Sequence, residues 1–224
     1  MGWTDSPGMG LGIVVGLLAD LDESDEDGAA WVRAQLEIVN ELLVEAGLQA
    51  HQEPTELGLI EMRSDLDSMP YSFLHYLRRA AARRRQDPTY VASAEDEDGD
   101  GDPAQDPAVQ EAGESFDFHL LVHSDAEGFY VPQRFSEVIF GTDDLPVAGG
   151  MLGSTQRLRD ELVEVAPALG IELDADGELN DAEAARLNAI IGDDGPLYRE
   201  LAAWLLLYEA ARISIARGPM IVFT

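Results

Sequence analysis

The amino-acid sequence predicts an α/β (or α+β) fold, with helices packed on a mixed, partly parallel β-sheet. Short apolar runs typical of strands alternate along the chain with segments of helical periodicity. At 46% hydrophobic over 224 residues, the chain can bury a substantial core. Residues 91–114 are acidic and poor in large apolar side chains, so we expect a disordered acidic insert there. Neither half looks able to cover its own apolar helices, which favours a single domain over 1–224.

The first half begins with the apolar run GLGIVVGLLAD at 10–20, which we expect to be a buried strand. An amphipathic helix should follow at 28–46, because apolar side chains recur at helical spacing and Gly47 is placed for a C-cap. The runs LQAHQEP and LGLIEM are candidate short strands. Strand, helix and strand in this order favour a right-handed crossover with parallel pairing.

A second helix is expected at 68–85, with Ser68 as its N-cap. Five arginines gather near its C-terminal end, where cations complement the helix dipole: Arg78, Arg79, Arg83, Arg84 and Arg85. The acidic insert follows within about ten residues and can fold back over them. Alternatively, the two could form a latch, in which a partner displaces 95–102 from the arginines.

The second half should contain strands and helices in turn. The alternation in SFDFHLLVH predicts a strand at 115–123. The remaining expected elements are short strands within FYVP and FSEVIFG, helices at 154–169, 181–191 and 196–217, and a terminal strand in PMIVFT. The helix at 196–217 is apolar nearly all round, so it is either covered by the core or forms a homodimer interface.

Charge is the strongest global feature of the sequence. There are 44 acidic and 14 basic residues, giving a formal net charge of −30, and every basic residue is an arginine. The nine acids of 91–115 account for only part of this, since the rest still carries −21. Such a field repels nucleic-acid phosphates and anionic membranes, so we expect neither as a partner and favour a basic protein. Hydration in high salt is the competing explanation.

Several classes of protein are excluded or disfavoured. No cysteine is present, which excludes disulfides, a thiol nucleophile and zinc–thiolate sites. The segment MGWTDSPGMG lacks signal-peptide features and no apolar run is long enough to span a membrane, so a cytoplasmic location is expected. The acidic run at 96–102 resembles the start of an EF-hand loop, but Pro107 stands where a bidentate Glu is required. We expect no metal and no cofactor.

The loop after the predicted strand at 115–123 is the main candidate site. It brings together a titratable base, a hydroxyl, carboxylates and a cation: His123, Ser124, Asp125, Glu127, Tyr130 and Arg134. On a strand, His119 and His123 would lie about 13 Å apart, too far to share one metal. The loop could be a polar turn, a binding loop or a catalytic site, and the serine lacks a nucleophile-elbow motif.

A second candidate is the glycine-rich VAGGMLGSTQRL, which leads into a helix. Its Gly150, Ser154 and Arg157 could hold an anion at the helix N-terminus, although the phosphate-binding and dinucleotide-binding glycine patterns are both absent. Two functions therefore remain. The favoured one is a non-enzymatic acidic binding protein, similar to an inhibitor, an immunity protein or an adaptor. The alternative is a hydrolase with its site around 123–134.

Overall fold

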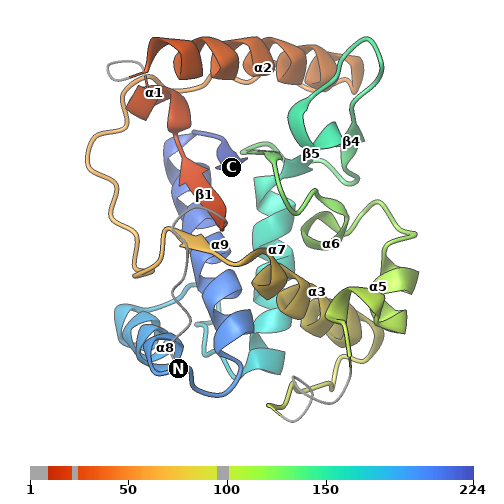
Figure 1. Cartoon of the computed structure of the whole chain (residues 1–224), viewed down its shortest axis with the longest axis vertical. Helices are drawn as coiled ribbons and strands as arrows, with labels where there is room; N and C mark the ends of the chain where they lie inside the picture. Colours follow the sequence, from red (N-terminus) through yellow and green to blue (C-terminus); the bar gives the residue numbers. More distant parts are fainter. Residues whose placement is uncertain (1–9, 22–24, 95–100) are drawn as a thin grey trace, which may run out of the picture.

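The computed structural model describes residues 10–21, 25–94 and 101–224. In these residues, eight α-helices pack on a six-stranded sheet that contains both parallel and antiparallel pairs, which confirms the predicted fold class (Figure 1). None of the described helices has the length and apolarity needed to cross a membrane.

The sheet has the strand order β2-β1-β6-β3-β5-β4. Among the described strands, β3 and β5 alone pair in parallel, and the other neighbours are antiparallel. The predicted parallel crossover from the first strand is therefore wrong, because both neighbours of β1 run antiparallel to it. The strands are β1 (Leu11–Val15), β2 (Ser68–Met69), β3 (Gly128–Val131), β4 (Ile139–Phe140), β5 (Met151–Ser154) and β6 (Ile221–Phe223).

The predicted long helices all form, with bounds shifted by a few residues. The α-helices are α1 (Leu17–Leu21), α2 (Glu26–Glu45), α3 (Tyr71–Gln86), α5 (Pro107–Ala112), α6 (His119–Val122), α7 (Thr155–Val165), α8 (Asp181–Gly192) and α9 (Tyr198–Arg217). Short 3-10 turns are η1 (Pro103–Gln105), η2 (Ala148–Gly150) and η3 (Ala166–Leu169).

Helix α2 covers one face of the sheet and lies along the top of Figure 1, with α1 packed against its first turns. Asp25 caps it by accepting the Gly28 N–H at 3.0 Å, and Gly47 follows its last turn with φ +77°. Its buried stripe packs on Phe129, Leu152 and Val222 of the sheet. Trp31 stacks on Phe129 with ring centroids 6.1 Å apart. The opposite stripe of α2 therefore faces solvent.

Helix α9 occupies the core on the other face of the sheet, among α3, α7 and α8 (Figure 1). Every residue from 201 to 211 is buried, and the Trp204 indole N–H donates to the Leu162 carbonyl at 2.7 Å. A homodimer through 196–217 is therefore wrong, because the apolar side chains that would form it are already covered by the chain itself.

Three predicted strands in the first half differ from the structure. The run at 10–20 is divided, since Gly16 takes φ +79° and ends β1, and α1 follows. LQAHQEP and LGLIEM form no strand and run as extended loop along the core. Hydrogen bonds to side chains hold this loop in place of the backbone hydrogen bonds of a sheet. The Asn40 side chain hydrogen-bonds both the N–H and the carbonyl of His51, and the Glu209 carboxylate accepts the Arg63 backbone N–H.

The predicted strand at 115–123 is also wrong. His119–Val122 form the short helix α6, whose first N–H groups, on His119 and Leu120, donate to the buried carboxylate of Glu161 at 3.0 and 2.7 Å. Glu161 lies on α7, about forty residues away in sequence. It satisfies the unpaired donors at the start of the helix, which a local alternation pattern cannot show.

The structure differs from the expected disorder over part of the acidic insert. Residues 95–100 lie outside the described residues, but 103–112 form η1 and α5 and pack against α3. Asp102 and Asp106 cap these two turns through the N–H groups of Ala104 and Ala108. Asp106 also pairs with Arg83 at 2.6 Å, so this part of the insert does fold back over the arginine cluster.

Candidate protein-binding surface

The predicted site loop forms a packed corner of the core. His123 is buried, and its ring stacks on Tyr130 with centroids 4.1 Å apart. Nδ1 lies 2.9 Å from the Ser124 carbonyl oxygen and Nε2 lies 3.1 Å from that of Phe129. Burial lowers the pKa of His123 to about 4, so the ring is neutral at pH 7. Both ring nitrogens face backbone oxygens, which leaves neither free to act as a base on a substrate.

The buried polar members of the two predicted sites tie strands and helices together. The Tyr130 hydroxyl donates to the His119 carbonyl at 3.1 Å. The Ser154 N–H donates to Nδ1 of His119 at 2.9 Å, and burial lowers the pKa of that histidine to about 4. The Ser154 hydroxyl caps α7 by accepting the Arg157 N–H, and Arg157 donates to the Asp117 carbonyl at 2.8 Å. These groups hold the core together, and their hydrogen bonds do not converge on one position where a ligand could bind.

The remaining predicted site residues lie at the surface without converging. The Ser124 hydroxyl accepts the N–H groups of Ala126 and Glu127, as in the predicted polar turn. Asp125 lies 3.3 Å from His75, and Arg134 pairs with Asp160 at 2.6 Å.

The two predicted loops do touch, but through their backbones. They meet at Gly149, where an added Cβ atom would lie 2.3 Å from the Glu127 carbonyl oxygen. The neighbouring Gly150, one of the predicted site residues, is exposed and has a φ of +75°. This close contact leaves no room for a ligand between them.

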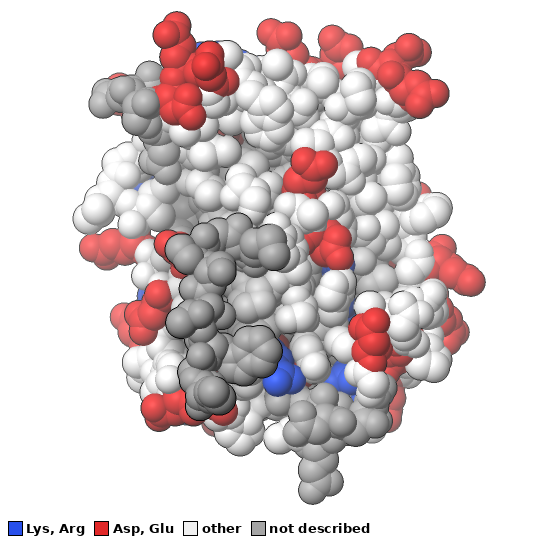
Figure 2. All heavy atoms as spheres, viewed as in Figure 1, with Lys and Arg blue, Asp and Glu red and all other residues white. Residues whose placement is uncertain are grey.

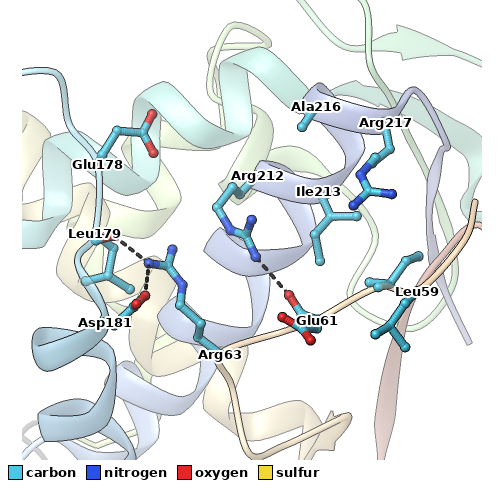
Figure 3. A pocket seen from close by; sticks show the side chains of 11 residues that line it. Leu59, Glu61, Arg63, Glu178, Leu179, Asp181, Arg212, Ile213, Ala216 and Arg217 are labelled. Carbon is cyan, nitrogen blue, oxygen red and sulfur yellow. Dashed lines mark hydrogen bonds and ion pairs between the residues drawn. The ribbon is translucent and has the colours of Figure 1, made fainter.

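A pocket of about 500 Å³ lies between α9, the loop at 59–63 and the segment before α8 (Figure 3). Arg63 and Arg212 border it, and both hold the buried carboxylate of Glu209, at 2.6 and 2.7 Å. Burial alone would raise the pKa of Glu209, but hydrogen bonds from Arg212 and Arg63 lower it overall. Both guanidinium groups are therefore engaged within the chain. We call the ion pairs of Arg63 and Arg212 with Glu209 the clamp, because they hold the loop at 59–63 against α9.

Most arginines are engaged in the same way. Among contacts between described residues, eight of the fourteen lie within 4.0 Å of a carboxylate, and others donate to backbone carbonyls, as Arg78 does to Leu120 at 2.8 Å. The eight are Arg63, Arg83, Arg85, Arg134, Arg157, Arg159, Arg186 and Arg212. Because these arginines pair with groups of the chain itself, the exposed acidic side chains dominate the electrostatic field around the protein.

The solvent-facing stripe of α2 carries an ordered row of these acids. Glu37, Glu41 and Glu45 are exposed and, in the part of the chain that the structure describes, none of them forms an ion pair. Positions four apart lie on one face of a helix, each about 6 Å further along its axis. Asp25, Glu26 and Asp27 add three carboxylates at the other end of α2. Figure 2 shows acidic side chains standing along the edge that α2 forms, with little basic surface on this face.

The hairpin between β4 and β5 presents a second acidic point. Thr142 and Leu145 exchange backbone hydrogen bonds of 3.1 Å, which places Asp143 and Asp144 at the exposed tip of a two-residue turn. The sequence did contain the signal for the α2 row, since acids recur every fourth residue within a predicted helix. The net charge of the chain does not reveal this spacing.

Among the described residues, no group of three or more His, Cys, Asp or Glu side chains is arranged to hold a metal ion. Residues 9–223 match a family model described as "Putative DNA-mimic protein". No curated protein and no solved structure matches the chain. The family match contradicts the predicted partners, a generic basic protein and no nucleic acid, because a DNA-mimic family implies a partner that binds DNA. A strongly acidic surface repels phosphates because it resembles them, and the same resemblance lets it occupy a phosphate-binding surface.

Proposed function

The chain belongs to this DNA-mimic family, and from that premise we propose that it binds a DNA-binding protein on the surface that would otherwise hold DNA. Its carboxylates take the place of phosphates. In this proposal it is a non-enzymatic inhibitor of DNA binding. Because its partner works where DNA is, we place its action in the cytoplasm.

The row on α2 is the observation that carries the proposal. The helix has 20 residues and is therefore about 30 Å long, close to one turn of B-DNA at about 34–36 Å. Six carboxylates lie between Asp25 and Glu45, and the exposed Arg33 offsets one of them, which leaves about one net charge per 6 Å of axis, against about one per 3.4 Å for a single DNA strand. The row thus carries somewhat more than half the linear charge density of one strand.

The row is also rigid, which matters for a mimic. Val39, Leu42 and Leu43 fasten α2 to the sheet through fully buried contacts, and Trp31 stacks on Phe129. Because the helix backbone is already fixed, only the side-chain rotamers of these carboxylates have to be ordered when a partner binds. A hydration role in high salt needs many acids but no such fixed row.

Competition with duplex DNA tests the proposal. The chain is immobilised, loaded with a lysate of its source cells at low salt, and eluted with duplex DNA. We expect DNA-binding proteins to be retained and then released by duplex at an ionic strength where an equal concentration of an uncharged polymer releases nothing. Retained proteins that stay bound when duplex is added would contradict the proposal.

A further inference from the structure

Two phenylalanines stand exposed beside the acidic hairpin. Phe116 and Phe140 are 49% and 42% exposed, and their rings meet edge to face with centroids 5.0 Å apart. Phe116 lies between α5 and α6, and Phe140 lies in β4, the edge strand of the sheet. All seven phenylalanines of the chain are described, and only these two are exposed. Burial in the hydrophobic core therefore does not explain the presence of these two side chains.

Exposed acidic residues neighbour this aromatic pair along the backbone. The Val138 N–H donates to the Phe116 carbonyl at 2.9 Å, which brings the backbone of the exposed Glu137 next to that of Phe116. Glu114 precedes Phe116 by two residues, and the hairpin tip with its two aspartates follows Phe140 closely. In the described part of the chain, neither Glu114 nor Glu137 forms an ion pair, whereas Asp117 is engaged by Arg85 at 2.7 Å.

Aromatic faces with carboxylates beside them select for arginine. The guanidinium is planar and weakly hydrated, so it can lie on a ring and still pair with a carboxylate, whereas the lysine ammonium is compact and strongly hydrated. The chain itself uses this contact: Arg85 lies 4.8 Å from the Phe118 ring centroid and Arg199 lies 4.8 Å from that of Tyr76.

We propose that Phe116 and Phe140, with Glu114 and Glu137, receive an arginine side chain from the DNA-binding face of the partner. The inference rests on the proposed function, since such faces are rich in arginines that contact phosphate. It also assigns association and dissociation of the partner to different parts of the surface. The acids on α2 speed the encounter, and the aromatic pair slows dissociation, because a desolvated anchor acts mainly on the off-rate.

Two synthetic peptides of equal length and charge test this, one alternating glycine with arginine and the other glycine with lysine. We expect the wild-type chain to bind the arginine peptide about two- to fivefold more tightly, as a cation–π contact at an exposed site provides. The preference should disappear in Phe116→Leu/Phe140→Leu, which keeps apolar volume but has no aromatic face, and in the corresponding alanine variant. Val91→Ala/Ile215→Ala, which trims two other exposed apolar side chains, should keep it.

The outcomes are decisive in both directions. Ring signals of the two phenylalanines, followed by NMR, should shift more with the arginine peptide than with the lysine peptide. Equal affinity of the wild-type chain for both peptides, or a preference that survives in the leucine variant, would overturn the inference. The proposed function would stand in either case, because it depends on competition with duplex DNA and not on a choice between cations.

Discussion

At the scale of single residues, Gly153 is required by its neighbour Tyr130. The two pair across the parallel strands β3 and β5, and a Cβ atom at Gly153 would lie 2.3 Å from a ring carbon of Tyr130. That ring is fully buried between His123 and Phe223, so it cannot move aside without disturbing both.

We therefore expect Gly153→Ala to lower the free energy of unfolding by about 2 kcal/mol or more, as overpacking of a core does. Urea denaturation measures this. Gly192→Ala is the matched control: nothing lies within 4 Å of its added Cβ and its position ends α8, so stability should change by less than about 1 kcal/mol. Equal losses in both variants would mean that the Tyr130 contact is not the cause.

His119 and His123 should resist protonation. The pKa of each is lowered to about 4 by burial, whereas in the unfolded chain it returns to about 6.5. Between these values the unfolded state binds more protons, so the stability that both contribute is complete above pH 6.5 and is lost as the pH falls toward 4. NMR titration of the imidazole signals should give midpoints near 4, and midpoints near 6.5 would contradict this account of the core.

Glu161 shifts in the opposite direction. Burial raises its pKa to about 7, against the lowering effect of the N–H groups of Leu120 and His119 and of Arg157. The folded state then binds the extra proton between about 4.5 and 7, and the stabilisation linked to this carboxyl is lost as the pH rises through 7. Glu161→Gln should therefore flatten the decline of the unfolding free energy between about pH 4.5 and pH 7. An unchanged decline would place its cause elsewhere.

At the scale of elements, α2 carries the interaction that we propose. Glu37→Gln/Glu41→Gln/Glu45→Gln removes three charges without altering the buried stripe, so the fold should be unaffected. The affinity for the DNA-binding partner should fall about tenfold or more, and the slope of log K against log salt should lose roughly one unit per contact removed. Fluorescence anisotropy at several salt concentrations measures both quantities.

The control for this triple variant removes the same number of charges elsewhere. Glu56, Glu61 and Glu164 are exposed and, within the described residues, take part in no ion pair. Their replacement by glutamine should leave affinity within about twofold at 0.15 M salt, where charges beyond about 8 Å are screened. If both triple variants lose affinity equally, net charge rather than the α2 row governs binding.

The clamp between the loop at 59–63 and α9 is a structural feature of the same scale. Arg63→Met leaves the fully buried Glu209 with Arg212 as its remaining cation, and should cost about 2–3 kcal/mol of unfolding free energy. Arg134→Met breaks the exposed pair with Asp160 and should cost less than about 1 kcal/mol. Chemical denaturation compares the two, and similar losses would refute the clamp.

Helices with strong periodicity could be predicted from the sequence, whereas elements fixed by distant partners could not. The helices at 28–46, 154–169, 181–191 and 196–217 match α2, α7 with η3, α8 and α9 closely. The error at 115–123 arose because Glu161, far along the chain, supplies the acceptor that lets α6 begin. Strand β5 was also missed, since its short run reads as a glycine-rich loop until Tyr130 is placed against Gly153.

The candidate site was harder to predict than the fold. His123, Tyr130 and Ser154 have the chemistry of a functional group, but their burial and backbone partners give them a structural role that composition does not reveal. The acidic row was visible in the spacing of Glu37, Glu41 and Glu45. The aromatic pair was not, because Phe116 and Phe140 are 24 residues apart and their exposure depends on the tertiary fold.

At the scale of the whole molecule, the two kinds of charge differ in their partners. Many arginines pair with carboxylates of the chain and bridge its elements, whereas exposed carboxylates that form no ion pair among the described residues stand along α2 and at the hairpin tip. A net charge of −30 produces a long-range field that attracts a cationic surface, and the field weakens as salt shortens the screening length. Such an arrangement imitates a polyanion without needing nucleotides.

The most direct test of the central claim is whether this chain and duplex DNA exclude each other on one partner. A protein that is retained by the chain and released by duplex is mixed with labelled duplex DNA, and the chain is then titrated in at constant ionic strength. Competition predicts that the labelled duplex is released completely, with an apparent affinity for the chain that weakens in proportion to the DNA present. A stable ternary complex, in which partner, duplex and chain migrate together, would contradict it.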